Sequence, residues 1–162
     1  MKKADTQTKP NPDGKRFVIS NRRARHEYHF DETYDAGIAL AGTEVKSIRA
    51  GQANLQDAYG KIEGGEVWLY NMHVNPYSHG TQWNMEPRRK RKLLLHRREI
   101  DRLRGHMEQK GLALIPLSVY FQHGFAKVEL GLGRGKKLYD KREDIAKKDV
   151  ERELRRELSA RE

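Results

Sequence analysis

The sequence lacks cysteine, long apolar runs and any catalytic signature. The absence of cysteine excludes disulfides, thiolate zinc sites and cysteine nucleophiles. No apolar stretch approaches the roughly 20 residues that span a bilayer, so we expect no membrane-spanning helix. Motifs of zinc proteases, serine hydrolases, protein kinases and Walker-type nucleotide sites are also missing. We therefore expect no catalytic residue, no cofactor and no resident metal.

The chain is rich instead in positive charge. Its 162 residues include 33 Lys or Arg and 23 Asp or Glu, which gives a formal net charge of +10. This balance favours a polyanionic partner, most often nucleic acid. The seven scattered histidines are accordingly interpreted as surface or RNA-facing side chains and not as metal ligands. The basic N-terminus has no apolar segment behind it, so we expect no targeting peptide and a cytoplasmic protein.

Three regions are expected along the chain. Residues 1–20 are polar and carry Pro10, Pro12 and Gly14, which predicts a flexible arm. Residues 21–133 are expected to form one RNA-binding β-barrel domain. Residues 134–162 have a helix-forming composition but a thin apolar stripe, which predicts a basic tail that is disordered alone and helical on the ribosome. The glycines at 131, 133 and 135 are expected to form a hinge.

The barrel prediction rests on about six strands with one early and one late helix. Gly64-Gly65 is a two-residue hairpin signal, Pro116 indicates an edge or bulged strand, and Gly111 ends the late helix. The expected elements are strand 21–29, helix 31–41, strands 44–50, 55–63 and 66–74, loop 75–87, helix 95–111, and strands 112–122 and 125–132. This pattern is typical of a mainly β, small antiparallel barrel of oligonucleotide-binding (OB-fold-like) type with peripheral helices.

Two stretches concentrate positive charge. In GTEVKSIRAGQANLQDAY (42–59), Lys46 and Arg49 give the expected strand a cationic edge suited to phosphates, and by the pleat they lie on opposite faces. An ordinary solvated strand is the alternative interpretation. The five consecutive basic residues Arg88 to Lys92 continue into a basic helix, which favours contact with nucleic acid over a merely solvated face.

Four stretches together resemble one family. They are NRRARHEY (21–28), YDAGIALAGTEVKSIRAGQANLQDAY (34–59), RKRKLLLHRREI (89–100) and GLGRGKKLYDKRED (131–144). Over nearly all of 21–145 the chain resembles the small protein B family, the bacterial SsrA-binding proteins that partner transfer-messenger RNA (tmRNA).

The resemblance implies a monomeric barrel that grips the tRNA-like domain of transfer-messenger RNA around its D-loop elbow. In the family, the complex enters ribosomes stalled on messages without a stop codon. The protein occupies the space of a codon–anticodon helix at the small-subunit decoding centre, and its tail reads the empty mRNA channel. Translation then resumes on the RNA's own reading frame, which is trans-translation, and the nascent chain is tagged for proteolysis.

The resemblance also implies site residues. RNA-binding positions are expected at Arg25, Asp35, Lys46, Arg49, Asn54, Leu94, His96 and Lys127. The decoding centre is expected to face His26 and Tyr28, and tail function is expected from Lys136, Lys137, Tyr139, Asp140, Lys141 and Arg142. Many relatives carry Glu at position 35 and Asn at position 96, and the Asp and His found here keep hydrogen-bonding capacity. Some relatives carry His at position 139, so Tyr139 argues against histidine chemistry there.

Composition leaves a second function class open. A basic structural ribosomal protein, with a globular head and an extension, would share the charge and the tail. A nucleic-acid-processing enzyme is a third class, but the sequence has no acidic cluster suited to divalent metals.

Overall fold

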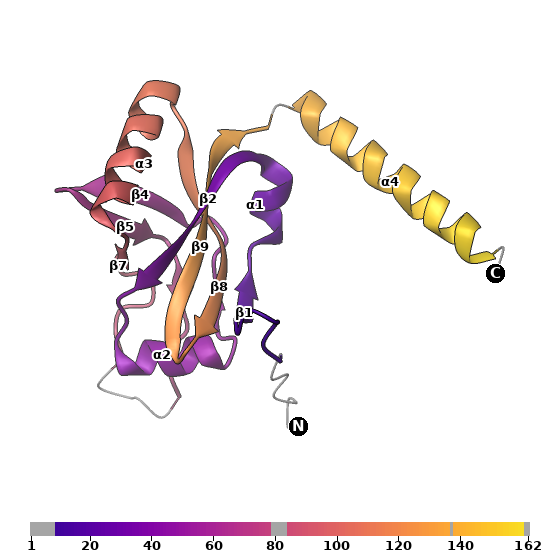
Figure 1. Ribbon diagram of the computed structural model, residues 1–162. Coiled ribbons are helices and arrows are strands. Elements are labelled where there is room, and N and C mark those ends of the chain that lie inside the picture. The colour runs from indigo at the N-terminus through magenta and orange to yellow at the C-terminus, as the bar shows by residue number, and fades with distance from the viewer. Residues whose placement is uncertain (1–8, 79–83, 137, 161–162) are drawn as a thin grey trace.

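The fold is a closed antiparallel barrel with helices at its periphery (Figure 1). The computed structural model describes residues 9–78, 84–136 and 138–160. Seven strands pair in the order β1-β8-β4-β5-β7-β2-β9, and a further pairing of β8 with β9 closes the sheet. They are β1 (Arg16–Ser20), β2 (Tyr28–Ile38), β4 (Tyr59–Glu63), β5 (Glu66–Tyr70), β7 (Arg91–Leu94), β8 (Ala113–Gln122) and β9 (Phe125–Gly135). The predicted mainly β barrel is confirmed.

Two short strands and four helices complete the described part of the chain. The strands β3 (Ala53–Asn54) and β6 (His73–Val74) pair with each other. The helices are α1 (Arg22–Glu27), α2 (Gly42–Arg49), α3 (Arg97–Lys110) and α4 (Leu138–Ala160). None of the described helices is long and apolar enough to cross a membrane. Within the same residues, no group of three or more His, Asp or Glu side chains is placed to hold a metal ion.

Alternating residues of the strands fill the barrel. Ala36, Val67, Leu69 and Val128 are completely buried, since successive strand side chains point to opposite faces. The helices add their own apolar positions, such as Ile48 of α2, which packs into the same cluster. Burying a side chain of this size stabilises the fold by roughly 1.5–3 kcal/mol. The outward-facing alternate positions are left to form surfaces.

Three predicted elements in the first third of the barrel are wrong. The expected strand 21–29 begins as helix α1, because the buried Asn21 side chain accepts a hydrogen bond from the Ala24 N–H (3.2 Å) and caps it. The expected helix 31–41 is part of strand β2. Its interior-facing Ala36 and Ile38 repeat every two residues and not every four.

The expected strand 44–50 is helix α2. Its buried residues are Glu44, Ser47 and Ile48, which have helical spacing, but two of them are polar and hide the pattern in the sequence. The Glu44 carboxylate accepts from the Ala41 N–H (2.9 Å) and so satisfies a free donor at the helix start. On a helix, Lys46 and Arg49 are three residues apart and lie on one side, in contrast to the predicted opposite faces.

Two predicted flexible segments are also ordered. Residues 16–20 were assigned to the flexible arm, yet they form β1, which pairs with β8. The glycines of the expected hinge lie in β9. A Cβ at Gly131 would meet the Phe30 ring at 2.5 Å, and a Cβ at Gly133 would meet the His29 carbonyl oxygen at 1.9 Å. These glycines therefore let β2 lie unusually close to its paired strand β9, near the β2 bulge between Phe30 and Glu32.

Most of the remaining elements agree with the sequence, but strand β7 was not predicted, and the expected strand 66–74 is two strands, β5 and β6. Gly64 and Gly65 have φ of 57° and 76° and connect β4 to β5, Gly111 ends α3 in the left-handed conformation, and the β8 bulge lies between Pro116 and Ser118. Helix α4 extends away from the barrel (Figure 1). Its large apolar residues from Ile145 onward are 47–66% exposed. The tail is helical over Leu138–Ala160, and the expectation that it folds only on the ribosome stays a prediction.

Candidate RNA interface

Cross-strand neighbours form a row on the outer face of the barrel. Gly37 on β2 pairs with Leu94 on β7 and with Lys127 on β9. Lys127 pairs with Tyr120 on β8, and Tyr120 with Phe17 on β1. Because directly opposed residues share a face of the sheet, these five residues form one band, called the outer row below. Three positions that the resemblance implied, Asp35, Leu94 and Lys127, therefore meet around Gly37.

Asp35 is held in place beside the outer row. The Tyr120 hydroxyl donates to Asp35 Oδ1 (2.8 Å), and Lys15 Nζ lies 3.8 Å from the same oxygen. Burial and the bond to this carboxylate raise the pKa of Tyr120, so its hydroxyl remains a donor. The Asp35 side chain is 53% exposed, and a fixed, exposed carboxylate is an acceptor for a ribose hydroxyl or a base amino group.

Leu94 and Lys127, which lie on either side of Gly37 in the outer row, differ in chemistry. Leu94 is 53% exposed and lies against Gly37, where a Cβ would contact it at 3.2 Å. Lys127 Nζ donates to Gln122 Oε1 at 3.4 Å. Phe125 lies two residues before Lys127 on β9 and is 72% exposed, the most exposed of the large hydrophobic side chains described. A cation beside an open aromatic ring suits a phosphate next to an unstacked base.

Sequence reasoning missed Phe125, Tyr120 and Lys15 as members of this surface. The alternation along β9 places Phe125 on the same strand face as Lys127, and that was the available signal. Tyr120 and Lys15 come from elements that are distant in sequence and meet only through the β1–β8 pairing.

Two other predicted RNA-binding residues, Arg25 and His96, lie next to the outer row. Arg25 on α1 lies 3.9 Å from Glu129, which pairs with Asp35 across β2 and β9. His96 is exposed between β7 and α3, and its backbone N–H donates to Glu99 (3.2 Å). Both therefore border the outer row.

Helix α2 carries the remaining predicted RNA-binding cations. Lys46 and Arg49 are exposed on it and lie over the rings of Tyr77 (5.3 Å) and Phe121 (5.2 Å). Asn54 is also exposed, but its Oδ1 accepts from the Gln56 N–H (2.7 Å), which gives it a local turn-forming bond.

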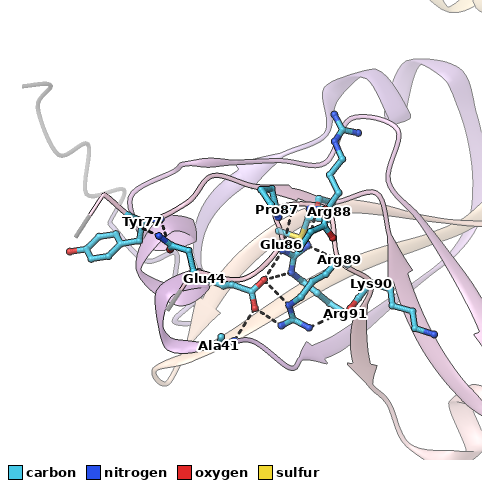
Figure 2. Close-up of polar contacts among 11 residues, drawn as sticks. Ala41, Glu44, Tyr77, Glu86, Pro87, Arg88, Arg89, Lys90 and Arg91 are labelled. Carbon is cyan, nitrogen blue, oxygen red and sulfur yellow. Dashed lines mark hydrogen bonds and ion pairs between the residues drawn. The ribbon is translucent and has the colours of Figure 1, made fainter. Parts of the chain in front are cut away.

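The basic run Arg88 to Lys92 is largely structural, in contrast to the predicted nucleic-acid contact. Arg91 is completely buried, and its Nε donates to Glu44 Oε2 (2.6 Å) while Nη1 donates to the Met72 carbonyl (2.7 Å). Arg89 also donates to both oxygens of Glu44. Figure 2 shows the two guanidinium groups converging on the one carboxylate. We call Glu44, Arg89 and Arg91 the Glu44 cluster.

Electrostatics support this structural assignment. Burial raises the pKa of Glu44, but hydrogen bonds from Arg89, the Ala41 N–H and Arg91 outweigh it and hold that pKa below its usual range. Burial also lowers the pKa of Arg91, against the opposing bond to Glu44. The neighbouring Lys90 and Lys92 lie 3.4 Å from Glu63 and 3.6 Å from Glu66. Most of the run is therefore neutralised within the protein.

The residues predicted to meet the ribosome lie at the junction of α1, β2 and α4. His26 and Tyr28 are half-buried, and the Tyr28 ring stacks on Phe30 with centroids 5.8 Å apart. Lys136 donates its backbone N–H to the Glu27 carbonyl (2.7 Å) and pairs with Asp144 of α4. Lys136 thus connects the barrel to the tail helix.

The other predicted tail residues are less fully described. Lys137 lies outside the described residues, as do His79 and Trp83 of the predicted loop. The backbones of Tyr139, Asp140 and Lys141 lie in the first turn of α4, and Arg142 is exposed.

Comparison with known proteins agrees with this architecture. The family model described as "SmpB protein" matches residues 18–160. The "SsrA-binding protein" of Desulforudis audaxviator is 63% identical over 139 residues, which cover 86% of this chain and 91% of the relative. The protein of the same name from Pelotomaculum thermopropionicum is 59% identical over 146 residues, 90% of this chain and 95% of the relative.

A solved structure shows the same similarity in three dimensions. It is described as "tmRNA-SmpB: a journey to the center of the bacterial ribosome" and matches with a TM-score of 0.63 at 56% sequence identity. The match covers 74% of this chain and 85% of the solved one. The family model and the curated relatives each span most of the chain, so the resemblance noted from the four stretches is confirmed. The chain therefore belongs to the SmpB protein family.

Proposed function

We propose that this protein binds the tRNA-like domain of transfer-messenger RNA and delivers it to stalled ribosomes for trans-translation. It acts in the cytoplasm as a monomer, and it acts by binding alone, without chemistry of its own. The observation that carries the proposal is the meeting of Asp35, Leu94 and Lys127 around Gly37 on the outer face of the barrel. The family's curated relatives, which bear the name SsrA-binding protein, support it.

The outer row offers the contacts that a folded RNA elbow requires. Lys127 supplies a cation for a phosphate, Asp35 an acceptor for a ribose or base donor, and Leu94 and Phe125 apolar surface for unstacked bases. Arg25, Lys46, Arg49, Asn54 and His96 extend this surface. None of these contacts reads a base sequence, so recognition depends on RNA shape.

The barrel and the tail have separate roles in this proposal. The barrel, from β1 at Arg16 to the end of β9 at Gly135, holds the RNA. His26, Tyr28 and the tail from Lys136 onward engage the decoding centre and the empty mRNA channel. The exposed helix α4 carries the tail's charges. Ordering the tail costs about 1–2 kcal/mol of conformational entropy per residue, and contacts with ribosomal RNA phosphates offset this cost. The tail residues assigned to this role are Lys136, Lys137, Tyr139, Asp140, Lys141 and Arg142.

The first test measures binding to the tRNA-like domain against bulk RNA. We expect Lys127→Gln to weaken binding, to reduce the slope of log affinity against log salt by about 1, and to leave the melting temperature unchanged. Lys110→Gln is the control, since Lys110 is exposed at the far end of α3. No preference of the wild-type chain for the tRNA-like domain at about 0.15 M salt would contradict the proposed function.

The second test separates barrel from tail. Deletion should begin at residue 137, because Arg134 and Gly135 pair with β2 and the Lys136 N–H bonds to Glu27. We expect the truncated chain to keep RNA binding and to lose tagging of a non-stop product. Joint replacement of Asp140, Lys141 and Arg142 by Ala is the narrower variant. Tagging that survives the deletion would refute the division of roles.

A further inference from the structure

A surface pocket separates the β4–β5 turn from helix α3. Its volume is about 350 Å³, and its lining includes Gly64 and Gly65 of the turn and Arg104 of the helix. Both glycines have positive φ, and neither places a side chain in the space. The turn therefore leaves open backbone facing Arg104, Met107 and Glu108 of the helix.

Two guanidinium groups converge on this turn from one helix. A Cβ at Gly65 would lie 3.3 Å from Arg97 Nη1 and 3.8 Å from Arg104 Nη2. Arg97 and Arg104 are seven residues apart, so two turns of α3 bring them to the same side. We call Gly64, Gly65, Arg97 and Arg104 the arginine pocket.

The charges of the arginine pocket are not internally balanced. Arg97 has a carboxylate on its own helix, Asp101, 3.6 Å from Nε. Lys61 of the lining is 3.5 Å from Glu63. Arg104 is half-buried and makes no ion pair or hydrogen bond with any residue that the structure describes, including Glu108 at the pocket edge. Asp101 therefore offsets part of the charge of Arg97, and Arg104 brings the unmatched positive charge, which an anion between the two guanidinium groups would balance.

We propose that the arginine pocket binds a backbone phosphate of the RNA partner. Guanidinium groups offer paired N–H donors that match phosphate oxygens, and the absence of a Gly65 side chain allows a phosphate to approach. Arg97 directly follows His96, and Leu94 of the outer row is two residues further back. RNA held on the outer row thus reaches the pocket by continuing past the start of α3.

This proposal deepens the proposed function and rests on it, so its test must be separable. The primary variant is Arg104→Gln, which removes a charge that has no partner among the described residues. The control is Arg102→Gln, the same change two residues earlier on the other side of α3, where Arg102 donates to Glu32 (2.9 Å). Affinity of the full chain for the tRNA-like domain is measured between about 0.05 and 0.2 M salt.

We expect Arg104→Gln to lower the salt slope by about 0.7–0.9, the value for one phosphate contact, and Arg102→Gln to leave it unchanged. The melting temperature of the free chain should stay the same or rise with Arg104→Gln, because a repulsion is removed. Equal slopes for wild type and Arg104→Gln overturn the proposal, and so does a fall in melting temperature, which identifies a structural arginine.

Further measurements distinguish a failure of the proposed function from a failure of the arginine-pocket proposal. If wild type shows no preference for the tRNA-like domain, the proposed function fails, and the same slope comparison on bulk RNA decides the arginine pocket separately. If millimolar inorganic phosphate stabilises wild type but not Arg104→Gln, while the RNA slopes are equal, the pocket binds free phosphate and the RNA proposal is overturned. Equal slopes together with Arg104-dependent binding of an acidic peptide overturn it likewise.

Discussion

The Glu44 cluster and the arginine pocket each bring two arginines together, and they do so with opposite consequences. In the Glu44 cluster, a nearly buried carboxylate lies between Arg89 and Arg91 and accepts from both. In the arginine pocket, Arg97 and Arg104 approach one glycine turn, and no carboxylate of the described residues pairs with both of them, since Asp101 pairs with Arg97 alone. The first arrangement stabilises the fold. The second leaves Arg104 without a carboxylate partner among the described residues, and this is the charge that the proposed phosphate would balance.

The difference shows that residues in a dense basic run need not be free to bind an external anion. Arg89 and Arg91 belong to the densest basic run in the sequence, yet their charge is used inside the protein. Arg97 and Arg104 are interspersed with acidic residues on an ordinary-looking helix. What separates the two pairs is the position of a single glutamate, 47 residues before Arg91, which only the folded structure reveals.

The largest effect is expected from breaking the Glu44 cluster. Glu44→Gln leaves the completely buried Arg91 without a counter-charge, and such a loss costs about 3–5 kcal/mol. Urea unfolding measures the change in free energy. The matched control is Glu63→Gln, which removes an acid that pairs with Lys61 and Lys90 near the surface. Equal losses for the two variants would mean that the cluster contributes no more than a surface pair.

The pH dependence of stability should follow from the same carboxylate. The pKa of Glu44 is lower in the folded chain than its unfolded value near 4.5, so its stabilising contribution is complete above that value. The contribution is lost as pH falls through the folded pKa, because the unfolded chain binds the proton more readily. The melting temperature of wild type should therefore fall steeply as the pH is lowered below about 4.5. Glu44→Gln should show a shallower fall, and an identical acid limb would refute the assignment.

The same comparison explains which elements of the fold could be predicted from the sequence. The β4–β5 hairpin, α3 and the β8–β9 pair were predictable, since their turn glycines and apolar periodicity agree with their burial. Helix α2 was not, because its interior face contains Glu44 and Ser47, and the partners that make a buried glutamate acceptable are distant in sequence. Gly131 and Gly133 suggested flexibility, whereas close approach of β2 explains them.

The candidate site was predictable to a different degree. Asp35, Leu94, His96 and Lys127 came from the family resemblance and not from residue patterns, because strands far apart in the chain bring them together. Phe125 had a signal in its alternation with Lys127. The arginine pocket had none, since the spacing of Arg97 and Arg104 becomes meaningful only where the Gly64-Gly65 turn meets α3.

The smallest effect is expected at an arginine between these extremes. Arg102 has a carboxylate partner, Glu32, but its own side chain is 62% exposed. Exposed pairs contribute about 0–1 kcal/mol, so Arg102→Gln should change the free energy of unfolding by less than about 1 kcal/mol.

The surroundings of Glu32 explain why this arginine matters so little. The Tyr34 hydroxyl bond is the main cause of the lowered pKa of Glu32 and persists without Arg102. Burial is the largest cause that raises the pKa of Tyr34 to about 12, and the hydrogen bond to the Glu32 carboxylate is the second. Titration of the Tyr34 phenol should consequently remain near this value in Arg102→Gln. A loss of stability as large as that of Glu44→Gln would show that burial of the carboxylate is not what distinguishes the Glu44 cluster from the Arg102–Glu32 ion pair.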